Sequence, residues 1–238
     1  MADKPVLATI TGELFQPVRL HYRVFDDKGL LQALTKLNCV KHDPPRQRWV
    51  WLYEDEARGL SFKQSYAQIS EKLRPIVLGS LIHRTSDTLL LDLRSGERAI
   101  EAIPFFDKHI PRGVAKLTEA EVANKLYPTD GPQLSPEDVF DHRPAAVRDS
   151  EAEFQRLAEQ VKQGRSFRAR LDILLKAFQS ATQKPLPETE RIPVHYYEDG
   201  IGGFKLALTL RQIVAREHWS GNTKYTLSDA IKATTKSM

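Results

Sequence analysis

The hydrophobic positions in the first half of the chain follow two different periods. Stretches rich in aromatic and β-branched residues predict strands, and between them apolar residues recur at helical spacing. Residues 76–82 and 88–93 are predicted to pair as a hairpin around the polar turn at 84–87. The other predicted strands cover residues 20–25, 49–53 and 114–117, and the predicted helices cover residues 30–37, 61–73, 95–103 and 118–126. This alternation predicts an α+β domain with a ferredoxin-like or related sheet-plus-helix arrangement.

Polar residues at helix-capping positions support several of these helices. Ser95 is the predicted N-cap of the helix that carries Ala99, Ile100 and Ile103. Capping-box spacing, in which two polar residues lie three positions apart, occurs in the pairs Ser61/Gln64, Thr118/Glu121 and Ser150/Glu153. We therefore expect helices to begin at these three places.

Prolines and glycines interrupt the chain near its middle. Residues 128–136 contain three prolines and one glycine, a composition typical of a linker. We expect an α+β domain at residues 1–127, a linker at 128–136, and a mostly helical domain at 137–238 with room for a short strand or hairpin. Predicted helices there cover residues 150–163 and 166–181, and residues 194–217 suit a strand at 194–197 followed by a helix at 204–217.

Composition excludes several classes of protein. Of the 238 residues, 41% are hydrophobic and 28% charged, which is typical of a globular chain. No apolar run approaches the roughly 20 residues of a membrane span, so we expect neither a membrane partner nor a secretion signal. Cys39 is the single cysteine, which excludes an internal disulfide and favours the cytoplasm. The net charge of +4 is spread over both halves and does not require a nucleic-acid partner.

The most distinctive motif combines basic and aromatic residues. Arg46 and Arg48 lead into a strand on which Trp49, Trp51 and Tyr53 share one face. Single-stranded nucleic acids stack their bases on such rows of rings, and nearby arginines bind the phosphates. The alternating residues of the other face are also apolar, however, which favours a central strand in the core. Both interpretations remain open at this level.

A second basic cluster lies between the two predicted helices of the second half. It consists of Lys162, Arg165, Arg168 and Arg170, without an acidic residue from 160 to 171. Cations at the end of a helix complement its dipole, which explains part of the cluster. The remainder could contact phosphates or an acidic protein surface.

Other candidate chemistry is sparse. A mobile turn is the favoured explanation of Gly200, Gly202 and Gly203, and the alternative is an anion-binding turn at a helix N-terminus assisted by Lys205. No two histidines lie three or four residues apart, so no metal site is expected. No phosphate-binding loop or nucleophile motif occurs, so the chain has no predicted catalytic residue and no predicted cofactor.

The segment LDLRSGERAIEAIPFFDKHIPR at 91–112 resembles part of an uncharacterised cyanobacterial protein family. The resemblance extends over about residues 75–126. It implies a bacterial cytoplasmic protein and transfers no catalytic or binding residue.

These observations predict a non-enzymatic binding or assembly protein that acts through protein–protein contacts. The alternative is a protein that binds single-stranded RNA or DNA through the aromatic strand and the basic cluster. The sequence leaves the oligomeric state and the identity of the partner open.

Overall fold

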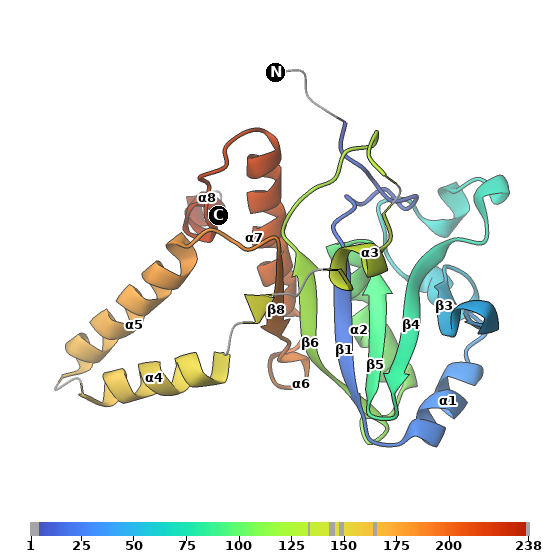
Figure 1. Ribbon diagram of the computed structural model, residues 1–238, viewed down its shortest axis with the longest axis horizontal. Coiled ribbons are helices and arrows are strands. Elements are labelled where there is room, and N and C mark those ends of the chain that lie inside the picture. The colour runs from blue at the N-terminus through green and yellow to red at the C-terminus, as the bar shows by residue number, and fades with distance from the viewer. Residues whose placement is uncertain (1–4, 133, 143–145, 148–149, 164–165, 237–238) are drawn as a thin grey trace.

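The computed structural model describes residues 5–132, 134–142, 146–147, 150–163 and 166–236. Eight strands in these ranges form one sheet in the order β2-β3-β4-β5-β1-β6-β8-β7 (Figure 1). Neighbouring strands are antiparallel, except that β7 runs parallel to β8. The strands are β1 (Val18–Val24), β2 (Val40–Asp43), β3 (Arg48–Leu52), β4 (Val77–Thr85), β5 (Thr88–Leu93), β6 (Ala115–Ala123), β7 (Ala146–Val147) and β8 (Thr189–Pro193). The helices are α1 (Asp27–Thr35), α2 (Gly96–His109), α3 (Pro136–Phe140), α4 (Ser150–Gln163), α5 (Phe167–Gln183), α6 (Tyr196–Asp199), α7 (Gly202–Trp219) and α8 (Leu227–Lys236).

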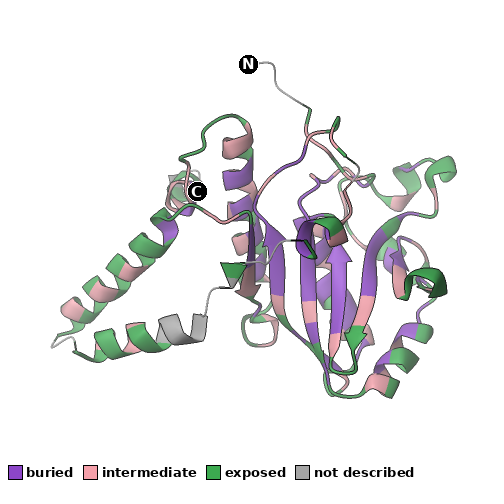
Figure 2. Ribbon diagram, in the orientation of Figure 1, coloured by how far each residue is buried: buried purple, intermediate pink, exposed green. Residues whose placement is uncertain are grey.

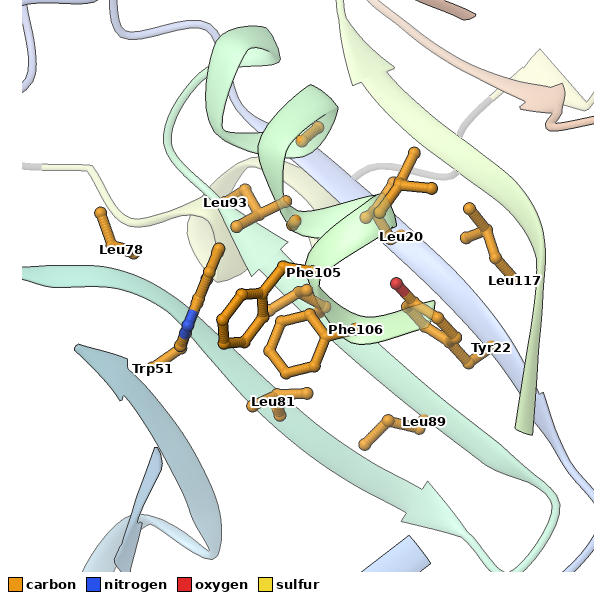
Figure 3. Packing of buried hydrophobic residues seen from close by; sticks show 14 of the residues in the cluster. Leu20, Tyr22, Trp51, Leu78, Leu81, Leu89, Leu93, Phe105, Phe106 and Leu117 are labelled. Atoms are coloured by element: carbon orange, nitrogen blue, oxygen red, sulfur yellow. The ribbon is translucent and has the colours of Figure 1, made fainter. Parts of the chain in front are cut away.

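The sheet has one apolar face and one polar face, and β1 shows how the sequence produces them. Leu20 and Tyr22 are buried in the main core on the side of α2 (Figure 3). Arg19 and His21 point to the opposite face, because side chains alternate along a strand. The same alternation on the neighbouring strands separates a hydrophobic core from a charged surface.

Helix α2 covers the apolar face. Its N-terminus is capped by Ser95, whose hydroxyl accepts a hydrogen bond of 3.1 Å from the backbone N–H of Arg98, as predicted. Phe105 and Phe106 of α2 pack against Trp51 of β3 with ring centroids 5.2 and 5.0 Å apart (Figure 3). These aromatic contacts join the helix to the sheet at the centre of the core.

The second half of the chain contributes to the same sheet. Strand β8 pairs with β6, and α7 packs beside α2. Glu190 of β8 is fully buried and accepts hydrogen bonds of 2.8 Å from Asn124, which follows β6, and from Arg211 of α7. Segments on both sides of residues 128–136 are therefore held together by buried polar contacts. The division into two domains remains a prediction.

Helices α4 and α5 form a hairpin that extends away from the sheet (Figure 1). Near its C-terminal end α5 packs against α8, whereas the end joined to α4 lies far from the sheet. No described helix is long and apolar enough to cross a membrane.

The structure confirms part of the predicted secondary structure. The 76–93 hairpin and the helices at 150–163, 166–181 and 204–217 are present. The helix predicted at 61–73 is wrong, because this segment has only two short 3₁₀ turns, Tyr66–Gln68 and Glu71–Leu73.

Two other predictions need correction. The helix predicted at 118–126 is wrong, because strand β6 occupies Ala115–Ala123. Pairing with β1 and β8 on its two sides overrides the helical preference of its alanine and glutamate residues. The strand predicted at 194–197 is also wrong: β8 ends at Pro193, and the short helix α6 follows.

Candidate functional site

A row of charged side chains crosses the polar face of the sheet. The strand register places Asp92 of β5 opposite Arg19 of β1, Arg19 opposite Glu121 of β6, and Glu121 opposite Arg191 of β8. Negative and positive charges thus alternate across four neighbouring strands. Opposite charges that face each other across strands stabilise their pairing.

Arg19 is the centre of this row and is almost completely buried. Its guanidinium binds Asp92 through two hydrogen bonds, with Nε–Oδ1 at 2.6 Å and Nη2–Oδ2 at 2.9 Å. Its Nη1 donates to Oδ1 of Asp141, just after α3, at 2.6 Å, and Phe140 lies over the guanidinium at 5.2 Å. Burial lowers the pKa of Arg19, but the hydrogen bonds and charges of Asp92 and Asp141 outweigh this and raise it. Arg19 is therefore a permanent cation that fixes α3 to the sheet.

Glu121 is the second buried charge of the row. Arg191 donates a hydrogen bond of 2.8 Å to its Oε1, and the His21 Nε2 lies 3.4 Å from its Oε2. Burial raises the pKa of Glu121, but the contacts with His21 and Arg191 outweigh burial and lower the pKa to about 2. The carboxylate is charged at neutral pH.

Replacing Glu121 by glutamine is expected to weaken the acid sensitivity of the fold. A carboxyl pKa of about 2 in the folded state, against the ordinary value of 4.5, contributes stability that is present above pH 4.5 and is lost as the pH falls toward 2. In Glu121→Gln this loss, at most about 1.4 kcal/mol per pH unit, disappears. Urea unfolding between pH 7 and pH 2.5 measures it. The control Val122→Ala removes no titrating group, so it should lower the free energy of unfolding at every pH without changing how that energy varies with pH. If Glu121→Gln leaves the pH dependence of the free energy of unfolding unchanged, the lowered pKa of Glu121 is contradicted.

A cavity of about 920 Å³ lies over this charged row. Arg23, Arg84 and Arg191 contribute cations to its wall, and Asp87, Glu119 and Asp141 contribute carboxylates. Asp141 accepts from Arg84 at 2.6 Å as well as from Arg19, so its carboxylate is shared by two arginines. An anionic ligand would have to replace a carboxylate that is already in place. The cavity therefore has stable charges but no surplus of one sign that would define a ligand.

The described residues offer no other obvious chemistry. Among them, no group of three or more His, Cys, Asp or Glu side chains could hold a metal ion. Cys39 is buried, and burial followed by the hydrogen bond and charge of Glu56 raises its pKa to about 12. Its thiol is protonated at neutral pH and is a poor nucleophile.

The α4–α5 hairpin carries a different kind of surface. Five large apolar side chains of α5 are exposed, from 43% for Leu171 and Leu174 to 82% for Phe167. Figure 2 shows α5 mostly in the colour of exposed residues, in contrast to the buried strands of the sheet. The five side chains recur at helical spacing and form what we name the α5 stripe: Phe167, Leu171, Leu174, Leu175 and Phe178. An exposed apolar stripe of this length is unusual unless another molecule covers it.

The predicted basic cluster lies on the same hairpin. Lys162 at the end of α4 and Arg168 and Arg170 at the start of α5 are exposed. Arg165 lies outside the described residues. The structure therefore brings the cluster next to the α5 stripe, a combination that the sequence predicted only as separate features.

The aromatic motif lies mainly in the core. Trp51 and Tyr53 are 0% and 1% exposed, so a three-ring platform is not present on the surface. Trp49 is partly exposed and packs on His42, with ring centroids 4.6 Å apart. Arg46 is exposed, whereas Arg48 is held by Asp43 and by the Ser80 hydroxyl at 3.0 Å. This geometry supports the core interpretation of the strand.

The glycine motif forms the turn between α6 and α7. Gly200 has a φ of 72°, which glycine adopts without strain, and Gly202 and Gly203 begin α7. Lys205 is exposed, but Asp199 also lines the small cavity beside the turn. The acidic neighbour disfavours an anion here, and binding at this turn remains a prediction.

Comparisons with known proteins add no relative. No family model, no curated protein and no solved structure matches the chain. Functional proposals therefore rest on the residues and their geometry.

Neither the charged row nor the exposure of the α5 stripe was predicted from the sequence. The alternation of Arg19, His21 and Arg23 with apolar residues was a signal for one polar sheet face. The helical spacing of Leu171, Leu174, Leu175 and Phe178 predicts the apolar face of a helix, but the sequence alone does not show which apolar face is left uncovered.

Proposed function

We propose that this chain is a non-enzymatic binding or assembly protein whose contact element is the α4–α5 hairpin. The observation that supports this most strongly is the α5 stripe, because five large apolar side chains remain exposed on an extended element. Protein partners commonly bind through apolar anchors of this kind. The charged sheet face has compensated charges and is better suited to holding the sheet together.

Site-specific photo-cross-linking tests this proposal. A photoreactive amino acid at Leu174 should form adducts with another protein in cells that express the full chain. The matched control is Asp172, which is exposed on α5 about 160° around the helix from Leu174. Adducts at position 174 but not at 172 would support the hairpin as the contact element. Equal adduct formation at both positions, or none at 174, would contradict it.

The variant Leu174→Glu provides an independent measure. Loss of a buried leucine at an interface weakens the binding free energy by about 1.5–3 kcal/mol, so the affinity for the partner should fall by about tenfold or more. Because Leu174 is exposed in the isolated chain, the melting temperature should hardly change. Titrations of the cross-linked partner with the wild-type chain and with Leu174→Glu measure this difference in affinity.

The second candidate function, binding of single-stranded RNA or DNA, is supported by the exposed basic residues of the hairpin. Nuclease-sensitive adducts at position 174 would favour it. A 260/280 nm absorbance ratio that falls after a high-salt wash of the purified protein would do the same.

We also propose a ferredoxin-like core within the sheet and a cytoplasmic location. Strands β6, β1, β5 and β4 are adjacent and antiparallel, and α1 and α2 lie in the βαββαβ order of that fold, with β2 and β3 inserted after α1. The single cysteine is buried, which suits a reducing compartment.

A further inference from the structure

The α5 stripe is separate from the side of α5 that faces α4. On α5 the partly buried residues are Ala169, Ile173 and Ala177, which recur every four positions and form one face of the helix. At 100° per residue, this face lies well over 100° from the centre of the α5 stripe. Packing against α4 therefore leaves the stripe uncovered.

The length of the α5 stripe defines the size of its occupant. From Phe167 to Phe178 the stripe spans eleven residue steps, which is roughly 16 Å along the helix axis. This corresponds to about three helical turns. A second amphipathic helix laid along α5 would cover it by ordinary helix packing.

The charges beside the stripe indicate the sign of the charge that a bound partner helix should carry. Arg168 and Arg170 lie on opposite flanks of the stripe, each roughly 80° from its centre, whereas Lys176 lies on the far side of α5. Asp172 is the one acidic residue of α5, so the helix has three cations against one anion. A partner with carboxylates beside its apolar face is electrostatically complementary to this surface.

The same charges disfavour a second copy of this chain as the occupant. In a twofold antiparallel pairing about the middle of the stripe, Arg168 and Arg170 of one copy would lie level with residues 175–177 of the other, which include no carboxylate. A second copy therefore offers these arginines no opposite charge at this surface. Helix α4 of a second copy offers no alternative, because its partly buried residues Leu157, Ala158 and Val161 share one face that fits its contact with α5.

We propose that the partner binds the α5 stripe through an acidic amphipathic helix of about three turns or more. This inference rests on the proposed function and names the chemistry of the partner: apolar side chains at helical spacing, flanked by aspartate or glutamate. The apolar contacts provide affinity, and the basic flanks select the sign of the partner's charge.

A charge-swap experiment on the full chain tests the proposal. The probes are two synthetic helical peptides with identical leucine positions, one flanked by glutamates and the other by lysines. In fluorescence anisotropy titrations the glutamate peptide should bind at least tenfold more tightly at low salt. This preference should shrink as salt screens the charges.

Two variants locate the effect. The double variant Arg168→Glu/Arg170→Glu should reverse the preference, so that the lysine peptide binds more tightly. The control Lys41→Glu/Lys63→Glu makes the same change in net charge at exposed positions outside the hairpin, and it should retain the preference for the glutamate peptide. Leu174→Glu should abolish binding of both peptides. Circular dichroism checks that each variant is folded.

Several results would overturn the proposal. Equal binding of both peptides, or a preference that the double variant does not change, would exclude an acidic helix even if cross-linking at Leu174 confirms a protein contact. Stripe-dependent binding of phosphatidylserine vesicles or of an oligonucleotide, without binding of the glutamate peptide, would assign the surface to lipid or to nucleic acid. Concentration-dependent dimerisation abolished by Leu174→Glu would assign it to a second copy.

Discussion

Replacing Trp51 by alanine is expected to lower the free energy of unfolding by about 3–5 kcal/mol. The indole is completely buried and packs against Phe105 and Phe106 of α2. Removing it leaves a cavity between α2 and β3 that well-packed neighbours fill only in part. Urea unfolding followed by circular dichroism measures the loss.

The neighbouring tryptophan provides the control. Trp49 lies on the same strand but is partly exposed and packs on His42 at a tilt, so Trp49→Ala should lower the free energy of unfolding clearly less. If Trp51 instead served as a stacking platform, its removal would leave the unfolding curve unchanged and would weaken binding of single strands by about 1–3 kcal/mol. An unchanged melting temperature in Trp51→Ala would contradict the core assignment.

Local sequence signals predicted much of the fold where they agreed with the tertiary environment. The hairpin at 76–93 combined two β-rich runs with a polar turn, and Ser95 began α2 at its predicted N-cap. The helix predicted at 118–126, where β6 lies, was wrong because the local signal disagreed with the tertiary environment. Thr118 and Glu121 have the spacing of a capping box, but these positions lie in a strand that pairs on both sides. Pairing with distant strands decided the structure there, and no local pattern reports it.

The candidate sites were less predictable because they depend on distant contacts. Arg19 meets Asp92 and Asp141 across 73 and 122 positions of sequence, so no local motif connects them. The α5 stripe illustrates the converse. Its periodicity was visible, but an apolar helix face normally predicts burial, and only the arrangement of the hairpin shows that the chain does not cover it.

The charged row and the hairpin are suited to different tasks, because one is buried and the other is in contact with solvent. Buried charges must be neutralised within the chain, because leaving a charge unpaired in the interior is costly. An exposed charge such as Arg168 on α5 is solvated and can exchange water for a partner's carboxylate at little cost. The sheet face therefore stabilises the fold, whereas the hairpin is available for binding.

Removal of the Arg19 side chain should have the second large effect on stability. In Arg19→Met, the Asp92 carboxylate, 2% exposed, loses both hydrogen bonds, and Asp141 loses one. Breaking a buried pair by removing one partner costs about 3–5 kcal/mol, chiefly because the remaining charge has no compensation. Urea unfolding at pH 7 should show this loss.

Two further variants distinguish the destabilisation caused by an uncompensated buried charge from the destabilisation caused by the loss of a contact alone. Arg84→Ala removes a guanidinium that binds the same Asp141 at the same 2.6 Å, but the Arg84 side chain is 46% exposed, so a loss of about 0–1 kcal/mol is expected. The double variant Arg19→Met/Asp92→Leu removes both members of the buried pair and should regain much of the stability lost in Arg19→Met, since an apolar pair of similar volume needs no compensation. Two outcomes would contradict a buried network of charges: equal losses of unfolding free energy in Arg19→Met and Arg84→Ala, or a double variant less stable than Arg19→Met. In either case α3 must be held to the sheet by the packing of Phe140 and Val139 instead.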